Sequence, residues 1–207
     1  MLPLVLILST IIVTAAVTIV SLVNRLRALE RQTVIDPLTG AFNRRHLERC
    51  LGVAVERRLR FGEPASLVLF DVERLKNIND RLGHAAGDAV LKALVVLIGR
   101  RARKLDVLCR LGGEEFALLL SAATGDHALV VAEQIRALAA RSRLIDGHAI
   151  SISVGVGELR EGQSPNEWLD DTDHALYHAK RCGRNRVAWN MRAESALSTC
   201  IDDARAV

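Results

Sequence analysis

Hydrophobic residues are distributed unevenly along the chain, and the first segment is almost entirely apolar. Residues 2–23 contain no Asp, Glu, Lys, Arg, His, Asn or Gln. A helix of this length spans roughly 33 Å at about 1.5 Å per residue, enough to cross a hydrocarbon layer of about 30 Å. The pattern therefore predicts a transmembrane anchor over residues 1–23.

Basic residues follow this apolar run and none precedes it. Arg25, Arg27 and Arg31 lie on its C-terminal side, and such residues mark the cytoplasmic side of a transmembrane helix. We therefore expect a single-pass protein of the inner (cytoplasmic) membrane in which the chain from Arg25 onward lies in the cytoplasm. A cleaved signal peptide is the alternative, but it requires a basic start and an apolar stretch of about 7–15 residues. A buried core helix would show a polar face.

Residues 24–35 are expected to form a juxtamembrane signalling helix or linker. Leu22, Leu26, Leu29 and Thr33 are spaced by 4, 3 and 4 residues, with Arg and Glu between them. This spacing is typical of a short coiled-coil seam that would align two copies of the chain. An ordinary juxtamembrane helix is the alternative.

Beyond the linker, helical and extended patterns alternate. Apolar periodicity predicts helices over residues 43–61, 88–103, 126–142 and 165–181, and strands over residues 66–70, 107–110, 115–120, 149–155 and 187–189. The stretch from Asp71 to Gly87 is polar and is predicted to be rich in turns. The order of elements indicates one α+β domain over residues 36–189, a mixed central β-sheet flanked by helices. Residues 190–207 show no pattern and predict a poorly ordered tail.

Two local signals are more specific than periodicity. The pair Gly112-Gly113 stands between two apolar runs, which predicts a β-hairpin. Ser164 followed by Pro165 and Glu167 predicts the N-terminus of the last helix, because these residue types form a capping box with proline at the first helical position.

Composition narrows the classes of partner. The formal net charge is +4, and the aromatic residues are two Trp, one Tyr and four Phe. So few rings offer little for stacking on bases, so we expect no nucleic-acid partner. The four cysteines, Cys50, Cys109, Cys182 and Cys200, form no metal knuckle or CxxC motif, so we expect reduced thiols.

Acidic residues occur where a strand ends and where the hairpin turns. Asp71 follows the strand predicted over 66–70, and Glu114 and Glu115 follow the paired glycines. If these strands are neighbours, three carboxylates meet at one edge of the sheet, where a hard cation such as Mg²⁺ would offset their repulsion. Two such metals would orient an attacking hydroxyl and shield a leaving pyrophosphate. Taken singly, each piece is more often a helix cap, a plain turn or a solvated tip.

Ordered motifs cover the rest of the domain: DPLTG at 36–40 with NRR at 43–45, FDVERLKNIND at 70–80, GHAAGD at 83–88, GGEEF at 112–116, and ALYHAK at 175–180 with GRN at 183–185. In this order and spacing they resemble the GGDEF family of diguanylate cyclases, in its GGEEF form. The resemblance extends from about Asp36 to Val187. It implies a nucleotide-cyclase or ferredoxin-like palm fold and an enzyme that condenses two GTP into cyclic di-GMP.

The resemblance also implies a role for individual residues. The metal, Mg²⁺ or alternatively Mn²⁺, would be held by Asp71, the Val72 carbonyl and Glu114, with Glu115 completing the site; whether Glu114 or Glu115 takes the proton is open. The GTP substrate would be held at its guanine by Asn79, His84 and Asp88 and at its phosphates by Lys76, Gly112, Gly113, Lys180 and Arg184, the last two also offsetting charge on the leaving group. Two domains would face each other as a homodimer.

Arg103 and Asp106 resemble the RxxD site at which members of the family bind their product as an inhibitor. Arginine can grip guanine or phosphate in bidentate fashion, and Asp can accept from a guanine N–H. An ion pair at the end of a helix is the alternative.

The chain departs from the family at three neighbouring positions. Glu73 stands where Asp is usual, Arg74 where an aromatic residue or His is usual, and Leu75 where Phe is usual. The last two remove ring surface near the expected nucleotide pocket. This favours, as an alternative, a catalytically weak domain that acts as a membrane receptor for GTP or cyclic di-GMP; a scaffold that only recruits partners is a third reading.

Overall fold

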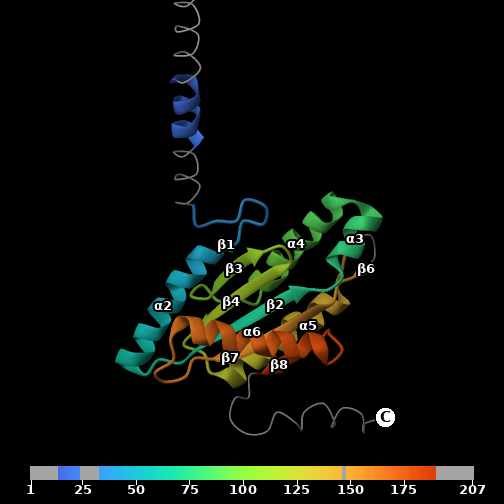
Figure 1. Ribbon diagram of the computed structural model, residues 1–207. Coiled ribbons are helices and arrows are strands. Elements are labelled where there is room, and N and C mark those ends of the chain that lie inside the picture. Colours follow the sequence, from blue (N-terminus) through green and yellow to red (C-terminus); the bar gives the residue numbers. More distant parts are fainter. Residues whose placement is uncertain (1–13, 24–32, 146–147, 190–207) are drawn as a thin grey trace, which may run out of the picture. The chain divides into compact units, whose positions relative to one another are not determined.

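The computed structural model describes residues 14–23, 33–145 and 148–189 (Figure 1). The chain divides into two compact units between Val34 and Ile35. In the first unit, residues 14–23 are helical. The rest of the predicted anchor, Leu26 and Leu29 of the predicted seam, and the predicted tail lie outside the described residues. Within the described ranges, none of the helices has the length and apolar character needed to cross a bilayer.

The second unit is an α+β fold. Its strands are β1 (Phe42–Asn43), β2 (Ala65–Val72), β3 (Val107–Gly112), β4 (Glu115–Ser121), β5 (Arg143–Ile145), β6 (His148–Ala149), β7 (Ile152–Glu158) and β8 (Val187–Trp189). Its helices are α2 (Arg44–Phe61), α3 (Leu75–Leu82), α4 (His84–Gly99), α5 (Gly125–Arg141) and α6 (Pro165–Arg181). The predicted mixed sheet flanked by helices is therefore confirmed.

Six strands form one sheet in the order β1-β3-β4-β2-β7-β8, and β5 pairs with β6 separately. β2 lies in the centre, antiparallel to both β4 and β7, whereas β1–β3 and β7–β8 are parallel. The central order β3-β4-β2-β7, with helices after the first and third strands in the chain, is the ferredoxin-like arrangement. It brings the C-terminal end of β2 next to the β3–β4 turn.

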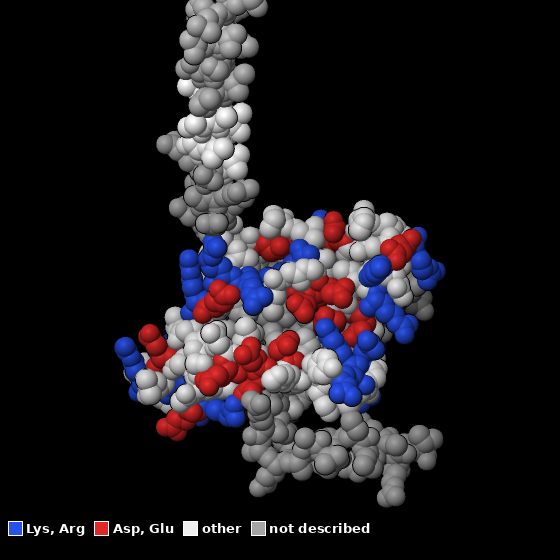
Figure 2. All heavy atoms as spheres, viewed as in Figure 1, with Lys and Arg blue, Asp and Glu red and all other residues white. Residues whose placement is uncertain are grey.

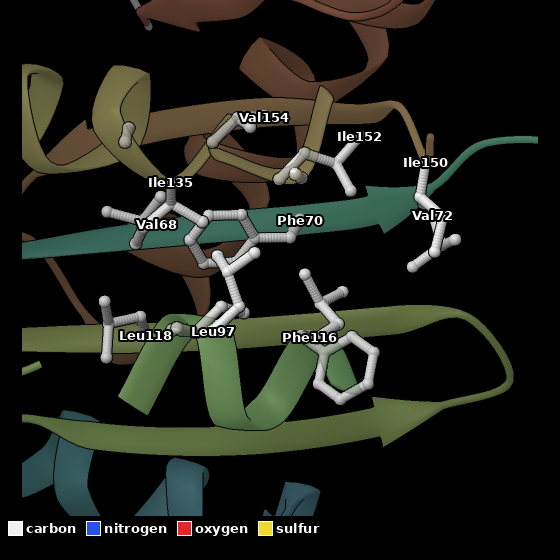
Figure 3. Packing of buried hydrophobic residues seen from close by; sticks show 14 of the residues in the cluster. Val68, Phe70, Val72, Leu97, Phe116, Leu118, Ile135, Ile150, Ile152 and Val154 are labelled. Carbon is white, nitrogen blue, oxygen red and sulfur yellow. The ribbon is translucent and has the colours of Figure 1, made fainter. Parts of the chain in front are cut away.

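Helices cover both faces of this sheet, because alternate residues of each strand point to opposite sides. One face packs against α4 and α5 around Phe70, Phe116 and Val154 (Figure 3). The other packs against α2 and α6, where Leu47 and Trp168 are fully buried. β7 is buried on both sides, as expected for a central strand, rather than alternating between core and solvent.

Two glycines of β7 allow α6 to approach the sheet closely. A Cβ on Gly155 would lie 2.4 Å from the amide nitrogen of Leu176, and one on Gly157 would lie 2.3 Å from the hydroxyl oxygen of Thr172. The N-terminus of α6 has the predicted capping box between Ser164 and Glu167. These contacts fix the helix whose last turn carries Lys180.

The prediction for residues 71–87 was wrong: most of this stretch is helical. α3 has Leu75 buried and Ile78 packed against the core, while Lys76, Asn77, Asp80 and Arg81 are exposed. The short amphipathic helix was hidden by its polar composition. α4 begins four residues earlier than predicted, at His84, and ends at Gly99.

The last long strand also differs from its prediction. β7 covers Ile152–Glu158, three residues beyond the predicted range, and Ala149 belongs to the separate pair β5–β6. The glycines in β7, which weaken a strand pattern in sequence, are accommodated here because α6 fills the space above them. Cys50 and Cys109 are free thiols, and burial, followed by the neighbouring Cys50, raises the pKa of Cys109 to about 12.

Candidate active site

The C-terminal end of β2 and the tip of the β3–β4 hairpin lie side by side. Asp71 is opposite Glu115 in antiparallel register, and the Val72 amide donates a hydrogen bond of 3.1 Å to the Glu114 carbonyl. The tip, Gly112-Gly113, has φ values of 145° and 52°, a backbone that glycine adopts most readily. The structure therefore brings the three predicted carboxylates to one edge of the sheet.

Two cations from the end of α6 reach this edge. Lys180 Nζ lies 2.6 Å from Asp71 Oδ2, and Arg184 Nε lies 2.9 Å from Glu73 Oε2. Figure 2, drawn from the same side as Figure 1, shows acidic side chains gathered near the end of β2 with basic side chains beside them. The predicted phosphate-binding residue Lys180 thus contacts the predicted metal-binding residue Asp71, whereas Arg184 pairs with Glu73, which was given no role in the prediction.

Glu114 is the acid most affected by this crowding. Its pKa is raised above the ordinary value of 4.5, first by burial and then by the negative charge of Asp71, while Lys180 partly offsets both and Glu73 and Glu115 add to the rise. A carboxylate whose ionised form is opposed by its neighbours favours a cation that relieves the repulsion. Electrostatics alone therefore predict that a metal ion binds more readily here than at an isolated acid.

The donor set fits a hard divalent ion that shares its coordination with a ligand. Asp71, Glu114 and the Val72 carbonyl offer oxygen atoms, the donors that Mg²⁺ prefers. Among the described residues, no three His, Cys, Asp or Glu side chains are arranged as a metal cage. Mg²⁺ commonly needs only one or two carboxylates when substrate phosphates and water complete the shell, so this arrangement suits a metal that enters with a nucleotide.

The predicted guanine-binding residues lie on the α3–α4 helical pair. Asn79 and the exposed Lys76 are on α3, and the exposed His84 and half-buried Asp88 are in the first turns of α4. Asn79 Oδ1 is buried and has no hydrogen-bond partner among the described residues. It rests against Gly87, where a Cβ would lie 2.0 Å from it. A buried acceptor needs a donor, which an ordered water or a bound ligand can supply.

Arg103 and Asp106 lie between α4 and β3, away from the hairpin tip. Asp106 accepts from the Arg103 amide at 2.6 Å and from the Ser121 amide at 3.4 Å, so it caps the backbone and does not pair with the Arg103 guanidinium. That guanidinium is exposed and lies 2.8 Å from His127 Nε2. The ion pair considered as an alternative is therefore not formed within the described residues, and the Arg103 side chain is held by α5.

The entry turn of the domain is tied to the hairpin by one arginine. Arg110 Nη1 lies 3.2 Å from Asp36 Oδ1, and Arg110 Nη2 donates to the Gly113 carbonyl at 2.8 Å. Burial alone would raise the pKa of Asp36, but hydrogen bonds from the Thr39 hydroxyl and amide, followed by Arg110, outweigh it and hold the pKa below 3.8. The turn at residues 36–40 is thus fastened to the tip of the β3–β4 hairpin.

Comparison with known proteins is consistent with this geometry. The family model described as the GGDEF domain of diguanylate cyclases matches residues 33–186, which is most of the chain. The chain belongs to this family.

Curated members of the GGDEF family share more than a third of their residues with the matched region. The diguanylate cyclase DgcM of Escherichia coli K12 is 40% identical over 159 residues, 77% of this chain and 39% of that protein. The response regulator PleD of Caulobacter vibrioides is 37% identical over 160 residues, 74% of this chain and 35% of that protein. The chain thus spans less than half the length of these relatives.

Solved GGDEF domains have the same fold. The GGDEF domain of DgcB from Caulobacter crescentus, crystallised in complex with c-di-GMP, superposes with a TM-score of 0.72 at 32% identity, covering 76% of this chain and 93% of that one. The active GGEEF domain of a diguanylate cyclase from Vibrio cholerae gives a TM-score of 0.70 at 34% identity, covering 73% of this chain and 98% of that one.

Several residues of this GGDEF domain site were missed by sequence reasoning. Glu73 and Leu75 were seen only as departures from the family, Arg110 and Ser153 were not singled out, and neither was His127. Leu75 proves to be a core residue, 7% exposed, so this position contributes to the hydrophobic core. Arg110 was the one with a usable signal, since a charged residue within the apolar run before the hairpin glycines is unusual in a strand.

Proposed function

We propose that this chain is a diguanylate cyclase that joins two molecules of GTP into cyclic di-GMP and releases two pyrophosphates. The observation that carries the proposal is the convergence of Asp71, Glu114 and Glu115 with Lys180, whose ammonium lies 2.6 Å from Asp71. Phosphoryl transfer requires carboxylates that hold a metal ion and a cationic side chain that binds phosphate, and both kinds of group meet here at one edge of the sheet. Membership of the GGDEF family, with the GGEEF form of its signature, supports the same reaction.

The cofactor we propose is Mg²⁺, with Mn²⁺ as an alternative. Asp71, Glu114 and the Val72 carbonyl would hold it, and it would supply positive charge to the phosphate oxygens during transfer. Glu115, exposed at the start of β4, would complete the site. Lys180 and Arg184 would bind the triphosphate and offset the charge that develops on the departing pyrophosphate.

The guanine base is proposed to lie between α3 and α4. Asn79 would find there the partner that its buried Oδ1 lacks among the described residues, and Asp88 would accept from the guanine edge. His84 would shape the pocket, and Lys76 would assist at the phosphates. The glycines at 112–113 let phosphate oxygens approach the backbone, because no Cβ intervenes.

The chemical step proceeds by attack of a 3′-oxygen on an α-phosphorus. The bond from that phosphorus to the oxygen leading to the β-phosphate breaks, and pyrophosphate leaves with the bonding electrons. The hydroxyl proton passes to a carboxylate, Glu114 or Glu115. The same exchange with the two nucleotides interchanged closes the ring, so a homodimer with two facing sites is needed for the product.

Residues 1–23 are proposed to anchor the protein in the inner membrane, with the catalytic domain in the cytoplasm. The proposal rests on the apolar run and on the basic residues that follow it. Residues 24–35 would then connect the anchor to the catalytic domain and align the two copies.

Product is proposed to inhibit through Arg103 and Asp106, because the exposed guanidinium of Arg103 remains able to bind a phosphate or a guanine.

The deciding experiment uses the full 207-residue chain, expressed in membranes and purified in mild detergent. The protein is incubated with GTP and MgCl₂, and nucleotides are separated by chromatography and identified by mass. Glu115→Ala is the inactive variant, and Glu161→Ala, an exposed acid on the loop before α6, is the matched control. We expect cyclic di-GMP from the wild type and the control only.

Fractionation of cells should place the full chain with the inner membrane, and deletion of residues 1–23 should release it.

The other outcomes separate the alternatives. GTP bound without turnover, also when a leucine zipper replaces residues 1–23 to enforce pairing, would replace the cyclase with a receptor. Phenotypes in cells that survive both Asp71→Ala and Glu115→Ala would instead support a scaffold. A strictly monomeric protein that still formed the product would refute the two-site mechanism.

A further inference from the structure

Glu73 is a buried acid at the edge of the active site for which neither the motifs nor the proposed reaction gives a task. Its side chain is only 6% exposed. Ser153 donates to Oε1 at 2.5 Å, Arg184 Nε lies 2.9 Å from Oε2, and the Glu73 amide donates to the Ser151 carbonyl at 2.9 Å. Both carboxylate oxygens and the backbone of Glu73 are therefore held by neighbouring groups.

Burying such an acid costs free energy of folding, so a functional role would explain its presence. A buried carboxylate loses its hydration and must be compensated by charge and hydrogen bonds. Glu73 also stands two residues from Asp71, and its charge is one of those that raise the pKa of Glu114. For stability and for metal-site electrostatics alone, an uncharged residue at this position would be the simpler solution.

The arginine that pairs with Glu73 is held in an unusual turn. Gly183, Arg184 and Asn185 all have positive φ values, of 110°, 61° and 46°; glycine and asparagine adopt this region readily, whereas the Cβ of Arg184 disfavours it. The Arg184 amide donates to the Ala179 carbonyl at 3.1 Å, at the end of α6. Arg136 Nη1 fixes the turn from α5 through Asn185 Oδ1 at 3.0 Å.

The pair is asymmetric in a way that suits ligand binding. The Arg184 side chain is 59% exposed, whereas that of Glu73 is 6% exposed. Glu73 engages Nε, and the two terminal NH₂ groups of the guanidinium have no partner among the described residues, so they are available to an anion. The carboxylate is closed to solvent, and Ser153, itself fully buried, holds its other oxygen.

We propose that Glu73, backed by Ser153, is a positioning residue that fixes the Arg184 guanidinium so that its terminal NH₂ groups face the triphosphate of bound GTP. The inference rests on the proposed function of Arg184. Arginine loses much rotational freedom when it binds a ligand, and an arginine already held at Nε has less freedom left to lose. Glu73 acts only through Arg184 and touches no reacting atom.

The neighbouring pair shows why the two acids have different tasks. Lys180 lies against Asp71 in the same manner, one helical turn before Arg184. Asp71 carries the oxygen atoms proposed for the metal, so its contact with Lys180 must be shared when the metal binds. Glu73 is saturated by Ser153 and Arg184 and can keep its contacts throughout the reaction.

The test is a double-mutant cycle on the full chain in detergent. Wild type, Glu73→Ala, Arg184→Ala and the double variant are titrated by calorimetry with 3′-deoxy-GTP and MgCl₂, a nucleotide that lacks the attacking hydroxyl. KM and kcat for GTP are measured in parallel. We expect Glu73→Ala to weaken binding and raise KM about tenfold with kcat changed less than threefold, and to have less than a twofold effect once Arg184 is absent.

The control is the pair Arg160–Asp171, which has nearly the same asymmetry: the side chains are 54% and 7% exposed. It lies at the other end of α6, so Asp171→Asn should lower thermal stability without changing KM. Glu73→Asp should restore part of the binding lost in Glu73→Ala. Ser153→Ala is a milder change that keeps the charge of Glu73, and it should weaken binding of 3′-deoxy-GTP about threefold. This variant replaces Glu73→Ala in the test if Glu73→Ala does not fold.

Three results would overturn the proposal. Equal effects of Glu73→Ala with and without Arg184 would show that Glu73 does not act through Arg184. Tighter nucleotide binding by Glu73→Ala would show that Glu73 competes with the triphosphate for the guanidinium. Unchanged nucleotide binding in Arg184→Ala would show that Arg184 does not bind the triphosphate. Whether the protein is a cyclase is decided separately, by cyclic di-GMP formation in the wild type.

Discussion

Replacing Gly87 by alanine should damage guanine binding while leaving the fold intact. A Cβ at this position would lie 2.0 Å from Asn79 Oδ1 and 2.9 Å from its Cγ. Both atoms belong to the far end of a side chain that can rotate, so the helices need not move and the Asn79 amide is the group displaced. That amide is one of the groups proposed to recognise guanine.

The expected changes in stability and in KM follow from the contacts of Asn79 in the free protein and in the nucleotide complex. Asn79 Oδ1 has no hydrogen-bond partner among the described residues, so its displacement breaks no hydrogen bond to any of them. Alanine is favoured over glycine within a helix by about 1 kcal/mol, which offsets the repacking. In the complex, one hydrogen bond is lost and a buried guanine group is left unpaired, a loss of about 1–2 kcal/mol. We therefore expect KM for GTP to rise roughly tenfold, since about 1.4 kcal/mol corresponds to tenfold.

The assay combines kinetics, binding and melting. KM and kcat for GTP, calorimetric binding of 3′-deoxy-GTP with MgCl₂, and thermal melting are measured for Gly87→Ala, Asn79→Ala and the double variant. The double variant should bind no more weakly than Asn79→Ala, because both changes remove the same contact. Gly52→Ala is the control, since Gly52 lies inside α2 and a Cβ added there would have no neighbour within 4 Å. An unchanged KM in Gly87→Ala, or fully additive effects, would refute the reasoning.

Three further predictions concern charge. At pH 7 without metal, Glu114→Gln should raise the melting temperature in calorimetry: the raised pKa of Glu114 favours folding only at low pH, and that contribution is lost as the pH rises from 4.5 through the folded-state value. Added MgCl₂ should stabilise the wild type more than this variant. Asp36→Asn should lower the free energy of unfolding by about 1–2 kcal/mol in urea titrations at pH 7. Because the pKa of Asp36 is depressed, this difference should be full above pH 3.8 and vanish as the pH falls through the folded-state value. Arg103→Ala should abolish inhibition by added cyclic di-GMP in initial-rate assays without changing the uninhibited rate; retained inhibition would place the product site elsewhere.

The sequence determined those features whose cause lies within a few residues. The capping box of α6 needs only Ser164 and Glu167, and the hairpin needs only a glycine pair between two apolar runs. The central strand β2 was found because it is apolar throughout, as a strand buried on both faces must be. The motifs also identified the residues that the structure gathers at the sheet edge, since Asp71 and the hairpin tip are each marked locally.

Short or interrupted patterns were predicted less well. α3 was taken for turns because only Leu75, Ile78 and Leu82 are apolar in it, and so small a helix is stabilised mainly by packing. β7 was placed three residues early because its glycines look like a strand end. In the structure they are required by the close approach of α6, a neighbour that no local pattern announces.

Only the tertiary structure decided which charged groups act together. Arg110 and Asp36 are 74 residues apart, Arg103 and His127 are 24 apart, and Ser153 and Glu73 are 80 apart. The sequence does not indicate which of these residues pair, because charge and hydrogen bonding depend on distance in space and not on spacing along the chain. The sheet order β3-β4-β2-β7 places Ser153 beside Glu73, and the turn after α6, with its positive φ values, places Arg184 against the same carboxylate.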